Sequence, residues 1–200
     1  MATVEDEPLL QPFESCSRLF TVEDLELLPT DLPSGPIDFE LDDGRLVFVM
    51  VPPGNIHGAA QVKIAAQLLF QGELNGYGKA RTEVGVILWR NPDRVVTPDV
   101  LFVGKKSLPL ETSREGYLET IPELVVEIRS KNDSSKYLER KVRHYLKAGV
   151  ETVWVADPAA RTVAVHTSQA DPAIFKDSDS LALPGLIADF CLPVADIFEE

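Results

Sequence analysis

The sequence lacks several features that mark specialised classes of protein. It has two cysteines among 200 residues, Cys16 and Cys191, which excludes a disulfide framework and a cysteine-rich metal site. It has no apolar run of the ~18–20 residues that a membrane-spanning helix needs, and residues 1–20 lack the basic start and apolar stretch of a signal peptide. Apolar residues make up 44% of the chain, which is too high for a disordered protein. We therefore expect a folded protein in the reducing cytoplasm.

Basic residues are scarce at both ends of the chain. The whole sequence has 19 Lys and Arg against 32 Asp and Glu, a net charge of −13. Residues 1–50 hold 12 acids and 2 bases, residues 151–200 hold 9 acids and 2 bases, and residues 51–150 hold 11 acids and 15 bases. The acidic total argues against a non-specific nucleic-acid binder. The basic middle still allows DNA to approach across one face.

The spacing of apolar residues predicts one α/β domain over residues 21–200, preceded by an acidic, flexible arm over residues 1–20. We expect a short helix over 21–28 capped by Thr21, and a loop over 29–36. The Asp43-Gly44 turn predicts a hairpin over 37–53. Longer helices are predicted over 57–72, capped by Asn55, and over 132–149, capped by Asp133 or Ser134 and ended by Gly149.

The remaining apolar runs predict strands. These strands cover 82–89, 95–103, 123–130, 152–158 and 161–167. The helix over 132–149 would form a parallel crossover between two of them. The fold class is thus a mixed β-sheet flanked by helices in a single domain.

Three acids stand on strands that should be largely buried. Asp99 shares a strand face with Leu101, and Glu127 shares one with Val125, while Glu40 lies on a half-apolar strand. Each has a plain alternative explanation: Asp99 as a turn acid after Pro98, and Glu127 as the ion-pair partner of Arg129. Two central acids would need two separate explanations. Converging carboxylates instead indicate a site for a divalent cation.

A lysine and a histidine border the apolar faces of the predicted helices. Lys141 follows Leu138 by three residues and precedes Tyr145 by four, so it can reach the sheet and stabilise charge there, or it can simply extend along the surface to solvent. His57 begins the apolar stripe of its own helix, as a functional residue or as a histidine satisfied by the backbone. The basic residues on the opposite side of the second long helix form a solvated or phosphate-facing surface: Lys136, Arg140, Arg143 and Lys147.

These landmarks, in this order, resemble the PD-(D/E)XK nuclease superfamily, and within it the Uma-type restriction endonuclease family of bacteria. The resemblance covers about residues 20–198. It rests on FELDDGRLV (39–47), His57, VVTPDVLFV (95–103), PELVVEIRS (122–130), Lys141 with Tyr145, AGVETVWVADP (148–158) and RTVAVH (161–166). It implies a restriction-endonuclease-like fold and hydrolysis of DNA phosphodiester bonds with Mg²⁺, or Mn²⁺ as a substitute.

The resemblance also implies a role for each site residue. Asp99 and Glu127, with the carbonyl of Ile128, would bind the metal, and Glu40 would be an additional acid. The family pattern has lysine where this chain has Arg129, and arginine stays protonated and cannot act as a base. Lys141 is then expected to take over the lysine's catalytic role, close to Glu127.

Contacts with the DNA backbone are assigned to three further residues. Arg129, Lys131 and His57 are expected to bind the substrate. The alternative function is that of a weakly active or inactive member of the fold, which binds or regulates as a homodimer. A third reading is a metal-dependent hydrolase that acts on another phosphodiester.

Overall fold

A computed structural model gives the fold of residues 18–25, 27–29, 31–32, 35–49, 54–114, 116–131 and 133–199. The arm expected over residues 1–20 lies almost entirely outside these residues, so the boundary at residue 21 stays a prediction. Within the described part of the chain, no helix is long and apolar enough to cross a membrane.

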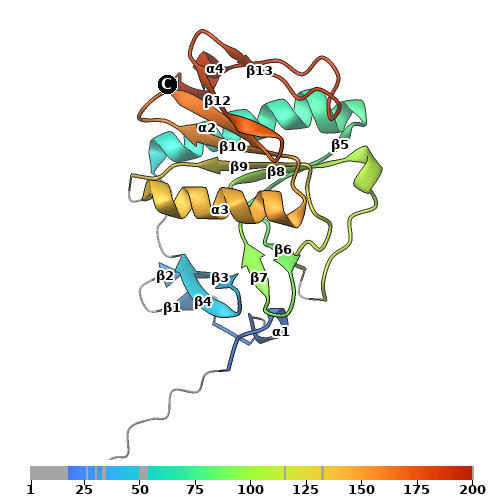
Figure 1. The fold of residues 1–200 in the computed structure, drawn as a ribbon, viewed down its shortest axis with the longest axis vertical. Helices are drawn as coiled ribbons and strands as arrows, with labels where there is room; N and C mark the ends of the chain where they lie inside the picture. The colour runs from blue at the N-terminus through green and yellow to red at the C-terminus, as the bar shows by residue number, and fades with distance from the viewer. Residues whose placement is uncertain are drawn as a thin grey trace, which may run out of the picture.

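The centre of the molecule is a six-stranded mixed sheet (Figure 1). Its strand order is β12-β11-β10-β9-β8-β5, in which β9 and β10 are parallel and the other neighbours are antiparallel. Helix α3 connects β9 to β10, so the predicted parallel crossover is confirmed. The strands are β5 (Gly78–Thr82), β8 (Val100–Gly104), β9 (Leu124–Ile128), β10 (Thr152–Asp157), β11 (Thr162–Thr167) and β12 (Ala170–Lys176).

A second, four-stranded antiparallel sheet lies below α3 in Figure 1. It has the order β4-β3-β7-β6, and its strands are β3 (Asp38–Asp42), β4 (Arg45–Val49), β6 (Val86–Trp89) and β7 (Arg94–Val96). The turn of the β3–β4 hairpin is Asp43-Gly44, with φ angles of 52° and 76°, as the sequence predicted.

The predicted strand over 95–103 is wrong as a single element. Its first part is β7 in the small sheet and its second part is β8 in the large one, with Thr97–Asp99 between them. Pro98 lies in this connection, outside both strands, where no backbone N–H is needed for a strand hydrogen bond. Asp99 therefore precedes a strand and does not lie within one.

The predicted strand over 82–89 also divides between the two sheets. Strand β5 ends at Thr82 and β6 begins at Val86, and Glu83 between them has a φ of 52°. We did not predict β5, because Gly78, Lys79 and Arg81 break up its apolar pattern. Other elements that the sequence left out are the pairs β1 (Asp31–Leu32) with β2 (Gly35–Pro36) and β13 (Ser180–Leu181) with β14 (Leu192–Pro193), the strand β12 and the helix α4 (Val194–Phe198).

The helices begin and end close to their predicted bounds. The short helix α1 (Val22–Leu25) follows Thr21, whose N–H donates to the carboxylate of Asp24. Helix α2 (Asn55–Gln67) continues as a π-helical turn, η1 (Leu68–Gly72), and its N-cap is Gly54, so the predicted Asn55 cap is wrong. Two short 3-10 turns follow later, η2 (Glu73–Asn75) and η3 (Lys105–Ser107).

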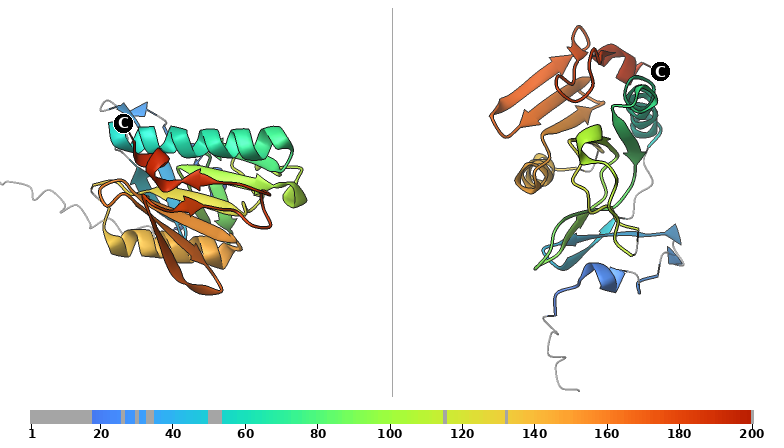
Figure 2. Two further views of the ribbon diagram at one scale, coloured as in Figure 1. Left: turned by 90° about the horizontal axis from the view of Figure 1, so that it is seen from above. Right: turned by 90° about the vertical axis from the view of Figure 1, so that its right-hand side faces the viewer.

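Helix α3 (Ser135–Ala148) is capped by Ser134, one of the two predicted caps, whose side chain accepts a hydrogen bond from the N–H of Tyr137. It ends at Gly149, which has a φ of 106°, a conformation that favours glycine. Figure 2 shows α2 and α3 on opposite sides of the large sheet. The result is a mixed sheet flanked by helices in a single domain, as predicted.

Two apolar layers cover the large sheet. Ile64 of α2 and Leu68 of η1 pack with Trp154 and the C-terminal segment on one face, and Val142 and Tyr145 of α3 pack on the other face. A third, smaller cluster joins α1 to the small sheet. Three buried charged side chains, Glu40, Glu127 and Lys141, lie at the edge between α3 and the two sheets.

Candidate active site

Asp99 and Glu127 come together because β8 and β9 are antiparallel neighbours. Val100 pairs with Val126, so the same register places Asp99 opposite Glu127. The Oδ2 atom of Asp99 accepts a hydrogen bond of 2.5 Å from the N–H of Ile128, the residue after Glu127. The chain path through the Thr97–Asp99 connection thus fixes one acid beside the other.

Glu127 is buried and binds two side chains of α3. The Nζ atom of Lys141 lies 2.8 Å and 3.0 Å from its two carboxylate oxygens, and the hydroxyl of Tyr145 donates to it over 2.5 Å. Lys141 is itself buried, with 9% of its surface exposed, so it does not extend to solvent. Its expected position beside Glu127 is observed.

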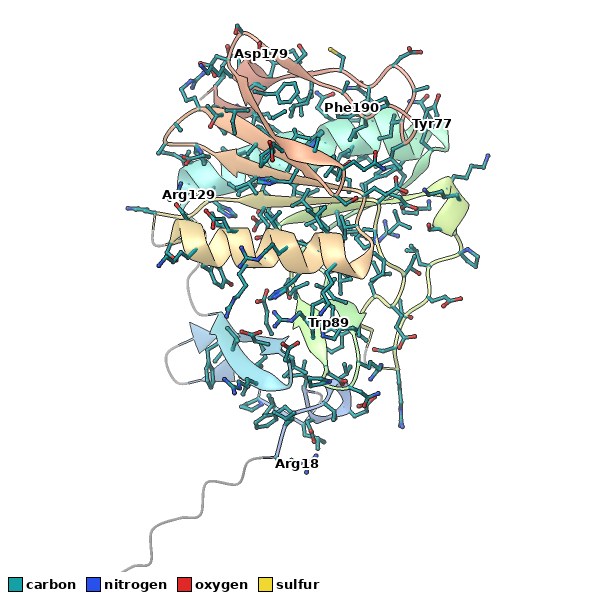
Figure 3. All side chains as sticks on the ribbon, in the orientation of Figure 1. Arg18, Tyr77, Trp89, Arg129, Asp179 and Phe190 are labelled. Atoms are coloured by element: carbon teal, nitrogen blue, oxygen red, sulfur yellow. The ribbon has the colours of Figure 1, made fainter. Side chains whose placement is uncertain are left out.

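Arg129 is not the partner of Glu127, so that alternative explanation is wrong. Its guanidinium binds Asp157 at 3.1 Å and the hydroxyl of Ser135 at 3.2 Å. Figure 3 shows Arg129 at the end of the sheet where α3 begins. Lys131 is exposed in the loop that follows. Both residues lie near the carboxylates along the chain but outside the buried cluster.

Glu40 reaches the same cluster from the small sheet. Its Oε1 atom accepts a hydrogen bond of 2.9 Å from the N–H of Thr97 and lies 3.6 Å from Nζ of Lys141. One ammonium group therefore faces two carboxylates from two different sheets. A cavity of about 20 Å³, enough for one water molecule, borders Glu40, Tyr137 and Lys141.

His57, at the start of α2, approaches from the opposite face of the sheet. Its Nε2 atom lies 3.3 Å from Oδ1 of Asp99, so the histidine binds this carboxylate and is not satisfied by the backbone alone. Gln61, one turn later, donates to the carbonyl of Asp99 over 3.0 Å and to Glu83 over 3.1 Å. Asp99 is thus held from α2 as well as from β9.

The electrostatics of the site follow from burial and from these pairs. Burial raises the pKa of Glu127 to about 7, with Lys141 opposing the rise and the charge of Asp99 adding to it. Burial alone would lower the pKa of Lys141, but Glu127 raises it well above its usual value. The hydrogen bond to Asp99 raises the pKa of His57. The ammonium of Lys141 is therefore fixed in its charged form.

Two residues of this site were not predicted as functional. The sequence marks Tyr145 only as an apolar helix residue and a family landmark, although it lies four residues after Lys141 and so on the same helix face. Gln61 shares a helix face with His57 in the sequence, but its role could not be predicted, because its partner is the carbonyl of Asp99, which only the fold brings near it.

The oxygen donors suit a hard divalent cation. Asp99, just before β8, and Glu127, in β9, offer two carboxylates opposite each other, and Mg²⁺ typically takes one or two carboxylates, with water and substrate phosphate filling the remaining positions. Among the described residues no group of three or more His, Cys, Asp or Glu side chains surrounds one point, so protein side chains alone would not complete the coordination. These residues fit a metal that is shared with a phosphate substrate.

Comparison with known proteins places the chain in a family. The sequence model of the Uma2 family, described as "Putative restriction endonuclease", matches residues 22–195. This chain belongs to the Uma2 family. The assignment supports nuclease activity in general terms, without specifying the metal or the nucleic acid. No curated protein matches the sequence.

A solved structure shares the fold of this Uma2 chain. It is a crystal structure from Anabaena variabilis described as a "putative nuclease belonging to DUF820". The two superpose with a TM-score of 0.72 at 21% sequence identity, over 90% of this chain and 97% of the other. At this identity the likeness establishes the fold alone.

Proposed function

We propose that this Uma2 protein is an endonuclease that hydrolyses phosphodiester bonds of DNA with the help of Mg²⁺. The observation that carries the proposal is the buried pair of Glu127 and Lys141, with the partly exposed Asp99 placed opposite Glu127. A structural ion pair would need one acid, whereas here Lys141 faces both Glu127 and Glu40, and Asp99 lies opposite Glu127 on the neighbouring segment. The cytoplasmic location stays a prediction.

Asp99, Glu127 and the carbonyl of Ile128 would hold the metal. When bound, the metal ion lowers the pKa of a water molecule and polarises the scissile phosphate. The protein supplies the geometry: the N–H of Ile128 and the hydroxyl of Tyr145 orient the two carboxylates before substrate arrives.

Lys141 provides the positive charge that the hydrolysis needs. Its ammonium group stays protonated, so it stabilises negative charge on the phosphate and orients the attacking water, without acting as a base. The small cavity beside it has room for that water. Arg129, which occupies the lysine position of the family pattern, binds Asp157 and is left to contact the DNA backbone.

The function is tested by incubating plasmid DNA with the protein and Mg²⁺ or Mn²⁺. We expect the wild type to cut, and Asp99→Asn and Glu127→Gln to lose cleavage by about a hundredfold or more. The matched control is Glu151→Gln, which removes an exposed acid paired with Lys106 far from the site. We also expect Mg²⁺ to raise the melting temperature of the wild type and not that of Asp99→Asn.

No cleavage by the wild type, together with no shift of its melting temperature by Mg²⁺, would contradict the proposal. That result would favour the alternative of an inactive protein that binds or regulates. Cleavage of other phosphodiesters but not of DNA would identify a different substrate for the same site.

A further inference from the structure

His57 is largely buried at the start of α2, and only one of its two ring nitrogens is in use. Its side chain is 11% exposed, and its Nε2 atom lies 3.3 Å from Oδ1 of Asp99. Its Nδ1 atom is buried and has no hydrogen-bond partner within the described part of the chain. A buried polar atom without a partner lowers stability, so a histidine that served the fold alone is expected to use both nitrogens. The placement of this ring therefore indicates a function for Nε2.

Two oxygen donors lie beside this nitrogen. The first is Oδ1 of Asp99. The second belongs to Ile128, whose backbone is close enough to help raise the pKa of His57, an effect that a carbonyl oxygen exerts on a ring N–H. Both oxygens belong to residues that we propose to hold the divalent ion.

The other contacts of the two acids show which oxygen is left for an ion. Oδ2 of Asp99 accepts the hydrogen bond from the N–H of Ile128, and the carboxylate oxygens of Glu127 are bonded by Lys141 and Tyr145. Oδ1 of Asp99 is left for an ion, and it faces His57 on the α2 side of the sheet. An ion bound to Oδ1 therefore lies next to the imidazole ring.

We propose that His57 is a nitrogen ligand of the divalent ion, beside Oδ1 of Asp99 and the carbonyl of Ile128. The inference rests on the proposed function, because it concerns the same ion. Two ligands at right angles, each ~2.1 Å from a metal ion, lie about 3 Å apart, and Nε2 and Oδ1 are separated by 3.3 Å. The ion takes the place of the ring proton on Nε2.

Helix α2 holds the ring in place before an ion binds. Gln61, one turn after His57, donates to the carbonyl of Asp99 over 3.0 Å and to Glu83 over 3.1 Å. These bonds tie the start of α2 to the segment that carries Asp99, so the two donor atoms are preorganised. Figure 2 shows α2 and α3 on opposite sides of the large sheet, so His57 and Lys141 approach the acids from opposite sides.

A nitrogen ligand changes which ion the site prefers. Carboxylate and carbonyl oxygens suit both Mg²⁺ and Mn²⁺, whereas imidazole suits transition-metal ions. We therefore expect the protein to bind Mn²⁺ more tightly than Mg²⁺, and we expect that preference to depend on His57.

Electron spin-echo spectroscopy of Mn²⁺ bound to the full chain tests the proposal. A histidine nitrogen bonded to Mn²⁺ gives a modulation that changes when histidine is labelled with the heavier nitrogen isotope. We expect the wild type to show this change and His57→Gln to lose it. His166→Gln is the matched control, since His166 is a partly buried histidine on the remote strand β11, and this variant should keep the signal.

Calorimetric titration gives a second measurement. His57→Gln should bind Mn²⁺ at least about tenfold more weakly than wild type. Its affinity for Mg²⁺ should fall less, because an amide oxygen in place of the ring nitrogen suits Mg²⁺. Circular dichroism and the melting temperature without metal check that the variant folds. His57→Asn repeats the test if His57→Gln does not fold, and the spectrum of the labelled wild type needs no variant.

Several results would overturn the inference. One is a wild type that binds Mn²⁺ without the histidine signal, and another is a His57→Gln variant that keeps the signal or binds Mn²⁺ as tightly as wild type. Tighter binding by the variant would show that the ring competes with the ion. In all of these cases the proposed function survives if Asp99→Asn abolishes Mn²⁺ binding. A wild type that binds neither ion overturns both proposals.

Discussion

Lys141 lies between two carboxylates, and its charge serves both. Its Nζ atom contacts Glu127 at 2.8 Å and Glu40 at 3.6 Å, in a place where burial would otherwise favour the neutral form of Glu127. The lysine therefore stabilises the folded protein, and at the same time it competes for the carboxylate that would hold a metal ion. These two roles can be separated by experiment.

Replacing Lys141 with Met tests both roles. We expect the free energy of unfolding without metal to fall by about 2–3 kcal/mol, because Glu127 loses its buried partner and escapes part of the cost by taking a proton. DNA cleavage should be lost, yet Mg²⁺ should raise the melting temperature of the variant more than that of wild type, since no ammonium group then competes with the ion for the carboxylate of Glu127. Lys136→Met, an exposed change on the same helix, should shift stability by less than about 0.5 kcal/mol. A smaller Mg²⁺ effect in Lys141→Met than in wild type would contradict the competition.

His144 makes the stability of the protein depend on pH. Burial and then the neighbouring Arg94 lower its pKa to about 4, and its Nδ1 atom lies 2.8 Å from the guanidinium. The unfolded chain takes up a proton near pH 6.5, whereas the folded protein resists until about pH 4. The stability that the folded protein gains by keeping His144 neutral is thus fully present above pH 6.5 and is lost as the pH falls towards 4.

Over this pH range the free energy of unfolding should fall by about 1–2 kcal/mol, after allowance for solvent screening at this half-exposed side chain. His144→Asn keeps a hydrogen-bond acceptor for Arg94 but does not titrate in this range. Urea unfolding at neutral pH and at about pH 4.5 should therefore show a larger loss for wild type than for the variant. Equal losses in the two proteins would exclude His144 as the cause.

At the scale of elements, the break at Thr97–Asp99 decides the shape of the site. Because β7 and β8 belong to different sheets, Asp99 lies at the junction of the sheets, where Glu40 also arrives. Helix α3 then closes the junction, bringing Lys141 and Tyr145 onto Glu127. Trp89 of the small sheet packs under the same helix, with Nζ of Lys147 4.6 Å from its ring (Figure 3). Helix α3 is thus in contact with both sheets.

Helix α3 depends on its first turn as well as on its packing. Ser134→Ala removes the side chain that accepts from the N–H of Tyr137, so we expect the free energy of unfolding to fall by about 1 kcal/mol. Ser178→Ala removes an exposed hydroxyl that caps no helix and should have little effect. Chemical denaturation of the three proteins decides the matter. A Ser134→Ala variant as stable as wild type would show that packing alone holds the first turn.

At the scale of the whole molecule, the uneven charge governs how DNA could approach. The middle of the chain supplies the exposed bases of α3, whereas both ends are acidic. Affinity for DNA should therefore be weak and should fall steeply as salt rises. Binding should also depend on where a charge lies more than on the total charge.

Two charge reversals separate position from total charge. Lys136→Glu, on α3, and Lys176→Glu, on β12, both replace an exposed lysine and change the net charge equally. In a cleavage-deficient Asp99→Asn background, fluorescence anisotropy should show weaker DNA binding for Lys136→Glu and a salt slope lower by about 1. Lys176→Glu should bind like its parent. Equal weakening by both would mean that net charge, and not the α3 surface, controls binding.

The sequence by itself determined the elements whose signals are local. The Asp43-Gly44 turn, the Ser134 cap and the Gly149 end of α3 depend on neighbouring residues, and they lie where expected. The parallel crossover follows from the order of the elements, and the rarity of acids on apolar strands is enough to single out Asp99, Glu127 and Glu40. The spacing of apolar residues and the preferences of turn and capping residues suffice to predict such features, because these effects act over a few neighbouring residues.

Only the tertiary structure decided which residues meet. A run of apolar residues over 95–103 carries no sign that its two parts join different sheets, because both parts have the same strand period. Whether Glu127 binds Arg129 or Lys141 depends on how α3 packs on the sheet, and the buried ammonium is retained only because two carboxylates reach it from separate sheets. Likewise the apolar outer side of α2 has the composition of buried core, and it is exposed because the sheet covers only the other side of the helix. These outcomes depend on long-range packing and desolvation, which no local pattern encodes.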